Sequence, residues 1–387
     1  MNFNTFAANQ DDIEHCAQAD NLTEVLLEPA LLARQGRLSL DEAGQLALIA
    51  RQQSLRPVLV WDALMPERLM VDTRAQLTGP FLSMFDAVRV SDIGAAHWLH
   101  THYPDLPLQL IVETGNHNWP ALQGWCDIFS PSLERLVLSI ELPEEKLVEY
   151  CHRLPVGCEV LGVGLILLFY SPRSLLAQHL APDADTTSYI EAIASPDDSS
   201  SLRPLPTVET RHGTLMFLDK DQFILDRLDA LRQAGLHTVR LDLRHLSHAG
   251  QAATGIVDLC HRIKHDAAGL RADWPRPIRA PFFKANKTTA QFGRMKSKRH
   301  NYRDGDTLAE VIAGDNGRYV VFQALRSFAI TEATAFVLPS GEILPWAPPS
   351  PLRNLNGDPI DMADTDQLLV TRWIKKACVG ALLKSKS

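Results

Sequence analysis

The feature that most constrains the fold is an alternation of short apolar runs with amphipathic helical patterns through residues 1–272. Each run has the length of a buried strand, and a helical pattern separates it from the next. The predicted strands are Asn4–Ala7, Thr23–Glu28, Pro57–Trp61, Asp86–Val90, Leu106–Val112, Leu133–Leu138, Cys158–Leu168 and Thr238–Leu243, and the clearest helices are Leu40–Gln53, Asp92–Tyr103, Pro143–Arg153 and Asp221–Ala234. Repeated strand–helix units predict a (β/α)8 TIM-like barrel, with an open doubly wound sheet as the alternative.

The longest apolar run, Val160 to Tyr170, predicts a strand that is buried on both faces. It is too short to cross a bilayer as a helix, which takes about 20 residues. The polar segment Tyr170-Ser171-Pro172-Arg173-Ser174 follows directly. In a parallel barrel the carboxyl end of a strand is where ligands bind, so this segment is a candidate site.

A connection of unusual length, residues 171–211, separates this strand from the next helical pattern. Connections of this length are functional loops or disordered segments. We predict a short strand, His212–Leu218, at its end.

Residues 273–387 are predicted to form a second domain, a small β-barrel. Two hairpins are expected, one around Gly314-Asp315-Asn316-Gly317 and one around Pro339-Ser340-Gly341. The segments Asp366–Lys375 and Val379–Leu383 would complete this domain.

Composition indicates a soluble, globular, cytoplasmic protein without a membrane partner. Apolar residues make up 45% of the 387 residues and charged residues 22%, and no secretion signal is recognised at the start. The formal net charge of -8 gives the whole chain no attraction to nucleic acid. The six cysteines are scattered, which favours reduced thiols over a disulfide framework.

Polar residues stand at or just after the predicted strand ends: Glu28, Asp62, Ser91, Asp92, Glu113, Asn116, Glu141, Arg173, Asp242 and Arg244. In one hypothesis Arg173 and Arg244 hold a small anionic substrate while Glu141 or Asp242 moves protons. The structural alternatives are that Glu141 or Asp92 caps the following helix and that Asp242 and Arg244 form an internal ion pair.

Four segments give the chain a resemblance to a known family. They are Val112-Glu113-Thr114-Gly115-Asn116-His117-Asn118, Leu136-Val137-Leu138-Ser139-Ile140-Glu141-Leu142, Tyr170-Ser171-Pro172-Arg173-Ser174-Leu175-Leu176, and His212–Asp221 followed by Arg240–Arg244. In this order they resemble the collagenase-like peptidase family, whose better understood members are oxygen-independent RNA and ubiquinone-precursor hydroxylases. The C-terminal region is similar to that of the prephenate-dependent tRNA uridine hydroxylase subfamily.

The resemblance implies site residues. It adds Glu113 to Glu141 and Asp242 as expected catalytic groups. It also adds Asn116, Asn118 and Tyr170 to Arg173 and Arg244 as expected substrate-binding groups.

The chain departs from the family at the iron–sulfur cluster. In the hydroxylases two cysteines in the segment after strand seven and two in the following loop hold the cluster. Here those first positions are Leu167 and Ser174, and the loop from Gln178 to Arg211 contains no cysteine. We therefore expect the cluster to be absent. No cofactor is predicted, and no metal site, because the histidine pairs lack further ligands in sequence.

A basic segment, residues 284–303, contains seven cations and no carboxylate: Lys284, Lys287, Arg294, Lys296, Lys298, Arg299 and Arg303. With aromatic neighbours such as Phe292 and Tyr302, it could follow a phosphate backbone, or it could be a solvated loop. The first hypothesis is therefore an RNA-associated protein, possessing modification activity or assisting a cluster-bearing relative. The others are an enzyme for a small anion and a peptidase, and the sequence leaves open whether the chain is an enzyme.

Overall fold

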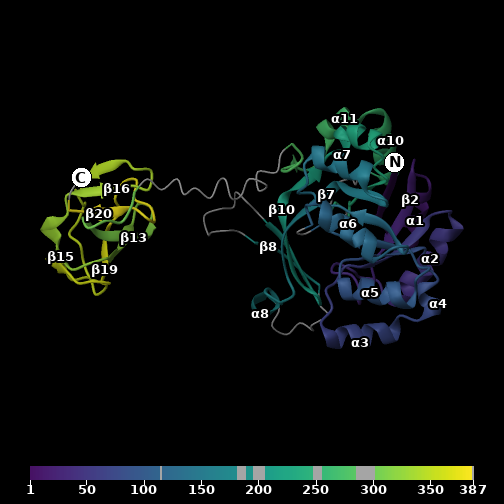
Figure 1. The fold of residues 1–387 in the computed structure, drawn as a ribbon, viewed down its shortest axis with the longest axis horizontal. Coiled ribbons are helices and arrows are strands. Elements are labelled where there is room, and N and C mark those ends of the chain that lie inside the picture. The colour runs from purple at the N-terminus through teal and green to yellow at the C-terminus, as the bar shows by residue number, and fades with distance from the viewer. Residues whose placement is uncertain (114–115, 181–188, 195–204, 247–254, 285–300, 386–387) are drawn as a thin grey trace. The chain divides into compact units, whose positions relative to one another are not determined.

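The structure, a computed structural model, describes residues 1–113, 116–180, 189–194, 205–246, 255–284 and 301–385. It divides the chain into two compact units, residues 1–287 and 288–387 (Figure 1). The domain boundary predicted from sequence lies after residue 272. Residues 273–284 lie within the first unit, where Trp274 and Phe283 join the barrel's apolar core.

The first unit is a closed eight-stranded parallel barrel. Its strands are β1 (Asn2–Phe6), β2 (Leu22–Leu27), β3 (Arg56–Trp61), β4 (Ala87–Val90), β5 (Leu108–Ile111), β6 (Leu133–Val137), β7 (Gly157–Ser171) and β11 (Thr238–Leu241). Each pairs in parallel with the next, and β11 pairs with both β1 and β7 and so closes the ring. The predicted barrel is confirmed, and the open sheet is excluded.

The helices of this unit lie between the strands in sequence. They are α1 (Gln10–Ala17), α2 (Leu40–Gln52), α3 (Glu67–Gln76), α4 (Gly79–Leu82), α5 (Ile93–His102), α6 (Trp119–Ile128), α7 (Glu144–Arg153), α8 (Ala177–Leu180), α9 (Asp229–Gln233), α10 (Ile256–His265) and α11 (Ala267–Asp273). The expected capping box is present on α2, where the Ser39 hydroxyl accepts from the Glu42 amide and the Glu42 carboxylate accepts from the Ser39 amide.

Strand β7 corrects the prediction of a strand buried on both faces throughout. Its first half lies in the barrel, and Ile166 is still buried. Leu167, Leu168 and Phe169 are 36%, 51% and 46% exposed. They are exposed because this half of β7 has left the barrel and pairs only with the antiparallel strand β10.

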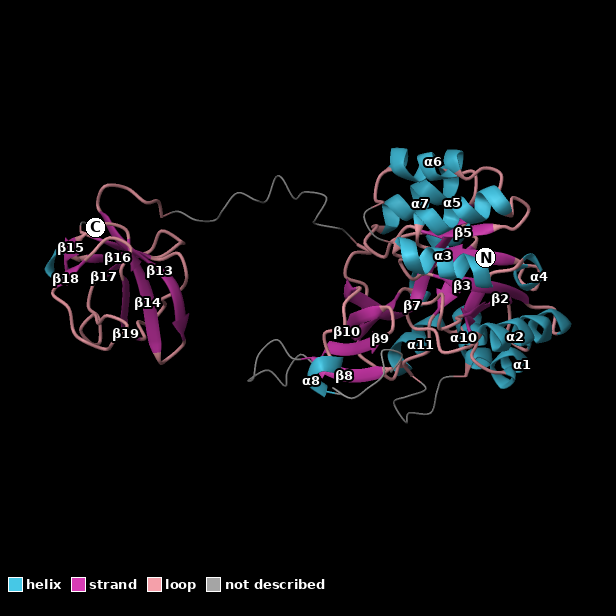
Figure 2. Cartoon of the chain, turned by 90° about the horizontal axis from the view of Figure 1, so that it is seen from below, coloured by secondary structure: helices cyan, strands magenta, loops and turns pink. Residues whose placement is uncertain are grey.

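The long connection is also more structured than predicted. Its described residues include β8 (Ile190–Ala194) and β9 (Leu205–Thr210). The strand predicted at His212–Leu218 is confirmed as part of β10 (Gly213–Phe223), and the three strands extend the sheet in the order β7-β10-β9-β8 (Figure 2). The β9–β10 turn requires Gly213, whose φ is 115° and whose missing Cβ would lie 2.0 Å from the Ser171 carbonyl oxygen. We call these strands the antiparallel extension.

The helix predicted at Asp221–Ala234 is wrong in its first part. Strand β10 continues to Phe223 because it pairs with β7 and with β12 (Ile278–Arg279). A 3-10 turn (Leu225–Arg227) and α9 then follow, and Gly235 ends that helix with a φ of 87°.

The second unit contains a six-stranded antiparallel sheet in the order β17-β16-β20-β13-β14-β19. Its strands are β13 (Thr307–Asp315), β14 (Tyr319–Ala324), β16 (Ala335–Val337), β17 (Ile343–Pro345), β19 (Leu368–Arg372) and β20 (Leu382–Lys384), and β15 (Phe328–Ala329) pairs with β18 (Met362–Ala363). Both predicted hairpins, β13–β14 and β16–β17, are confirmed. The unit has an apolar core of its own around Phe322, Phe328 and Phe336.

Candidate functional site

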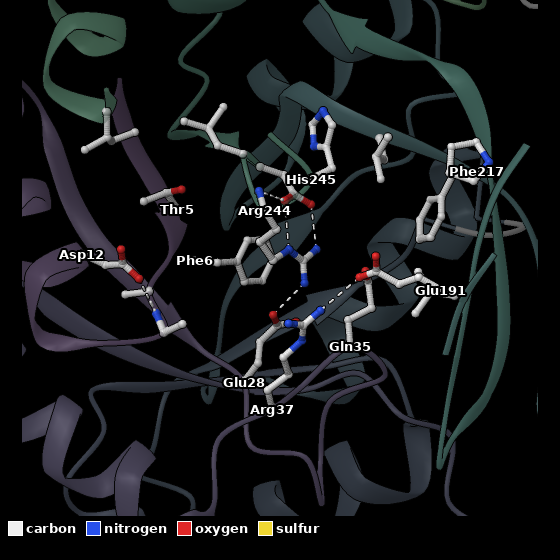
Figure 3. Close-up of a pocket in the computed structure, with 18 of the residues that line it drawn as sticks. Thr5, Phe6, Asp12, Glu28, Gln35, Arg37, Glu191, Phe217, Arg244 and His245 are labelled. Carbon is white, nitrogen blue, oxygen red and sulfur yellow. Dashed lines mark hydrogen bonds and ion pairs between the residues drawn. The ribbon is translucent and has the colours of Figure 1, made fainter. Parts of the chain in front are cut away.

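A cavity of about 950 Å³ lies at the carboxyl ends of β1, β2 and β11. Phe6, Glu28 and Arg244 line it from the barrel, and Glu191 and Phe217 line it from the antiparallel extension (Figure 3). The end of a parallel barrel where ligands bind is thus walled on one side by β8 and β9, which the sequence analysis left inside a long loop, and by β10, where it predicted the strand His212–Leu218.

Arg244 is the best-fixed charge in this cavity. Its Nε and Nη2 donate to the two oxygens of Asp242 at 2.9 and 2.7 Å, and its Nη1 donates to Glu28 at 2.6 Å. The guanidinium carbon lies 3.6 Å from the centre of the Phe6 ring. Asp242 and Arg244 lie just beyond β11, which ends at Leu241 rather than at the predicted Leu243. The alternative of an internal ion pair is therefore present, and Arg244's predicted role in substrate binding stays a prediction.

Glu28 and Asp242 share Arg244 but titrate differently. Burial would raise the pKa of both carboxyl groups, yet two contacts with Arg244 lower the pKa of Asp242 to about 2. Burial raises the pKa of Glu28 to about 7, because its single contact with Arg244 is opposed by nearby Asp62 and Asp242. Glu28 is therefore the carboxyl group in the cavity whose pKa suits proton transfer near neutral pH.

Asp62, after β3, is engaged by Arg34, whose backbone amide and Nε donate to it at 2.7 and 2.9 Å. Asp92 caps α5 by accepting from the Ala95 amide at 2.9 Å. This is the structural role that the sequence reading weighed against function for Asp92.

A layer of buried polar residues fills the barrel beneath the cavity, and the sequence reading missed most of it. Asn4, Glu24, Arg89, Gln109, Arg135, Glu159 and Arg240 each come from a different strand. Arg89 donates to Glu159 at 2.5 Å, and Arg135 donates to Glu24 at 2.5 and 2.8 Å. Although burial alone would raise the pKa of Glu24, Arg135 lowers it to about 2. The layer is thus made of paired charges, as buried charges require.

The signal for this layer was visible in the sequence as polar residues inside apolar strands, for example Arg89 in Ala87-Val88-Arg89-Val90. Several of its buried polar atoms form no hydrogen bond with the described residues, namely Asn4 Oδ1, Arg89 Nη1, Arg135 Nε, Glu159 Oε1 and Arg240 Nε. Partly satisfied groups of this kind are usual sites for buried water.

Glu113, one of the expected catalytic residues, extends this layer toward the carboxyl end of the barrel. It accepts from Arg240 Nη2 at 2.5 Å, and Arg240 Nη1 lies 3.7 Å from Glu159. Glu113 is not one of the described residues that line the cavity. The structure therefore does not bring Glu113 together with Asp242 in one cavity.

Glu141, Asn116 and Asn118 belong to a separate cluster beyond β5 and β6. His117 Nε2 lies 3.1 Å from Ser139 Oγ and 3.6 Å from Glu141. Asn116 accepts from the Trp125 indole, and Asn118 caps α6 by accepting from the Ala121 amide. Both Ser139 and Glu141 contact the same ring nitrogen of His117, whereas a hydrolytic triad places the nucleophile and the carboxylate on opposite nitrogens of the histidine.

The end of β7 and the segment that follows it have polar contacts of their own. Tyr170 donates from its hydroxyl to the His212 carbonyl at 2.8 Å, and its ring lies under Arg34. The Arg173 side chain is exposed and makes no ion pair with any residue in the described part of the chain. Neither residue lines the cavity.

The buried carboxylate of Glu209, which lies on β9, accepts hydrogen bonds from the segment that follows β7. It accepts from the backbone amides of Leu175, Leu176 and Ala177 at 2.5, 2.7 and 2.9 Å, and from the Thr214 hydroxyl at 2.7 Å. Burial would raise the pKa of Glu209, but these donors lower it. The amides next to Ser174 are therefore already committed to an internal carboxylate.

The donor set does not fit the family's iron–sulfur cluster. Cluster ligands are thiolates, and Leu167 and Ser174 offer none. Burial raises the pKa of Cys16 to about 12, of Cys126 to about 11 and of Cys260 to about 12, so these thiols lie far from the thiolate form.

Most of the predicted RNA-binding segment lies outside the described residues, namely Lys287, Arg294, Lys296, Lys298 and Arg299. At its ends, Lys284 is exposed, and Arg303 forms an ion pair with Glu310. None of the described helices is long and apolar enough to span a membrane.

Known proteins that are similar to this chain have low sequence identity to it. The sequence profile of peptidase family U32 matches residues 29–254. The tRNA hydroxylation protein P of Escherichia coli K12 is 30% identical over 96 residues, which are 24% of this chain and 20% of that protein. The tRNA hydroxylation protein P2 of Bacillus subtilis 168 is 24% identical over 180 residues, 44% of this chain and 57% of that protein. The chain therefore spans from a fifth to just over half of these relatives' lengths.

A solved U32 peptidase has 12% sequence identity and a TM-score of 0.35, over 43% of this chain and 70% of that one. That similarity is too low to add to the fold, which rests on the strand pairings above.

Proposed function

Because the chain belongs to peptidase family U32, we propose that it is an RNA-associated member that works at the barrel mouth without an iron–sulfur cluster. It either modifies RNA itself or assists a cluster-bearing relative. The names of the relatives as tRNA hydroxylation proteins support the choice of RNA.

The observation that carries the proposal is the cavity at the barrel mouth. About 950 Å³ lies at the large end of the range for small-ligand pockets and suits a nucleotide. Phe217 offers an aromatic face for a base, whereas Phe6 and Tyr189 each carry a guanidinium, of Arg244 and Arg37, over one face of the ring. Gln35 and Glu28 offer hydrogen-bonding groups for the edge of the base. Glu28, with a pKa of about 7, is the residue to exchange a proton with a bound base.

The contact between Glu209 and the segment after β7 supports a role without a cluster. The space beside Ser174 that would need thiolates is instead closed by a carboxylate bound to three backbone amides. Two negatively charged groups, a cluster with its thiolates and Glu209, would repel each other at that position.

The two other hypotheses gain less support. An enzyme for a small anion would need a guanidinium that is free to bind it in the cavity. Asp242 and Glu28 already bind Arg244, and Arg173 does not line the cavity. A peptidase would need an accessible nucleophile, and Ser139 is 1% exposed.

The test is binding of bulk tRNA as a function of salt. For single-stranded RNA each neutralised phosphate contributes about 0.7 to the slope of log affinity against log salt. Reversing Lys296, Lys298 and Arg299 to Glu should weaken binding and flatten that slope by about two units.

A matched control reverses Lys146, Arg68 and Arg232, which are exposed cations of the barrel unit, and changes the net charge equally. It should lower affinity far less. Equal loss in both triple variants would show a mere net-charge effect. Absence of salt-sensitive binding by the unmodified chain would reject the RNA proposal.

A further inference from the structure

A cluster of metal-ligating side chains lies at the amino end of the barrel, away from the cavity. His261 and His265 stand one helical turn apart on α10, and Asp20 lies in the turn between α1 and β2. One ligand atom from each of the three lies within 4.8 Å of the others. The sequence reading discounted this histidine pair because no third ligand lies near it in the chain. The fold supplies Asp20 from 241 positions away.

The geometry suits a bound cation better than a direct hydrogen bond. His261 Nδ1 and Asp20 Oδ2 are 4.0 Å apart, which is too long for a hydrogen bond. The two imidazole rings lie 4.5 Å apart between centres, at 41° to each other. Around tetrahedral Zn²⁺, bonds of about 2.0–2.1 Å place ligand atoms roughly 3.3 Å apart. Small side-chain rotations would therefore bring these three atoms onto one ion.

The backbone that carries these ligands is well fixed. Spacing of four residues places His261 and His265 on one face of α10. The turn that holds Asp20 is set by Asn21, which has a φ of 58°, and Cys16 and Cys260 are buried in the core of this unit. Among the described residues, the ion pair with Asp20 and the ring contact are the side-chain interactions of this pair.

We propose that Asp20, His261 and His265 form a binding site for a divalent transition-metal ion of the Zn²⁺ class. Two neutral imidazoles and one carboxylate are a ligand set that Zn²⁺ accepts, and water would complete the coordination. The ion links α10 to the α1–β2 turn. Asp20, His261 and His265 do not line the cavity, so the proposal is independent of the RNA proposal.

The experiment is isothermal titration with Zn²⁺ of the full chain, without a polyhistidine tag. Cys378 is replaced by Ser in every sample, because this exposed thiol could bind zinc by itself. One Zn²⁺ per chain is expected. His261→Ala and His265→Ala should each weaken it at least about tenfold, since even loss of an outer-shell partner costs 10–100-fold. Asp20→Asn should weaken Zn²⁺ binding less than either alanine variant, because asparagine keeps an oxygen that can still bind the ion, although an amide oxygen is a poorer ligand than a carboxylate.

His152→Ala is the matched control, since it removes an exposed histidine of α7 and should leave the affinity unchanged. Replacement with Co²⁺ gives a second reading through visible absorption, which should disappear in the His261→Ala variant. If no zinc binds, or if His261→Ala and His265→Ala bind it as tightly as the parent, the cluster is an ion pair only and the proposal is overturned.

Discussion

Two carboxyl groups that share one arginine show how the number of contacts sets ionisation. Asp242 accepts two hydrogen bonds from the Arg244 guanidinium and one from the Arg244 backbone amide and has a pKa of about 2, whereas Glu28 accepts one and has a pKa of about 7. Both side chains are largely buried, so desolvation acts on each. The difference follows from the fork of a single guanidinium, most of which Asp242 occupies.

The raised pKa of Glu28 predicts how the stability of the protein depends on pH. Because its pKa rises from 4.5 in a free chain to about 7 here, the folded protein binds more protons between these values than the unfolded protein. Stability from this group is therefore lost as pH rises through that window. Glu28→Gln cannot ionise. Relative to the parent, its free energy of unfolding should rise by on the order of 1–3 kcal/mol between pH 5 and pH 8.

Urea unfolding at several pH values measures this difference. Glu14→Gln, at an exposed position on α1, should shift it by less than about 0.5 kcal/mol at any pH. A pH-independent difference for Glu28→Gln would show that Glu28 ionises normally.

At the scale of elements, the decisive change is the departure of β7 from the barrel. Its outer half pairs with β10 and so builds the antiparallel extension that walls the cavity. Glu209 of β9 fixes the segment that follows β7 by binding three backbone amides and Thr214. A strand, a turn and a carboxylate therefore jointly replace a simple loop.

We predict that Glu209→Gln destabilises the first unit by about 1–3 kcal/mol, because buried donors lose a charged acceptor. The pKa of Glu209 is lowered, so its contribution is present above pH 4.5 and is lost as pH falls through the folded-state pKa. Chemical denaturation at pH 7 and pH 3 should show a large and a small effect, respectively. Glu191→Gln, in the exposed pair with Arg37, should be near neutral at both; an equal loss in both variants would contradict the assignment.

The same segment predicts the cofactor content. Protein prepared without oxygen should contain no iron–sulfur cluster, because Leu167, Ser174 and Glu209 offer no thiolate. Iron and acid-labile sulfide assays measure this directly. A brown preparation with near-stoichiometric iron and sulfide would show that other residues hold a cluster.

At the scale of the whole molecule, the chain consists of two units with separate cores. In the second unit Phe322 is fully buried and packs edge-on against Phe336 and Trp346. Among the described residues, those that form this core lie between Leu308 and Leu383. The small unit therefore has the apolar core that independent folding requires.

We predict that residues 301–387 fold alone with a cooperative thermal transition. Calorimetry should detect the same transition in the full chain. Phe322→Ala should destabilise this transition by about 3–5 kcal/mol and leave the barrel's transition in place. Phe223→Ala, buried in the barrel, should do the reverse. A single transition that both variants shift equally would mean that the units do not fold separately.

What the sequence determined by itself was the architecture. Strand and helix periodicity are local, so eight apolar runs and their helices predicted the barrel, and Gly314-Asp315-Asn316-Gly317 predicted its hairpin. Local signals also placed the Ser39 cap and the end of α9 at Gly235.

What only the tertiary structure decided was which polar groups meet. Asn4 and Glu159 are 155 positions apart and bond at 2.9 Å, because the closed ring brings β1 and β7 around one interior. Glu28 contacts Arg244 at the end of the same ring, while Glu113 and Glu141, predicted as catalytic residues like Asp242, lie in other clusters. Periodicity shows that a residue is in a strand, but the register and closure of the barrel set its neighbours, and those neighbours set its charge.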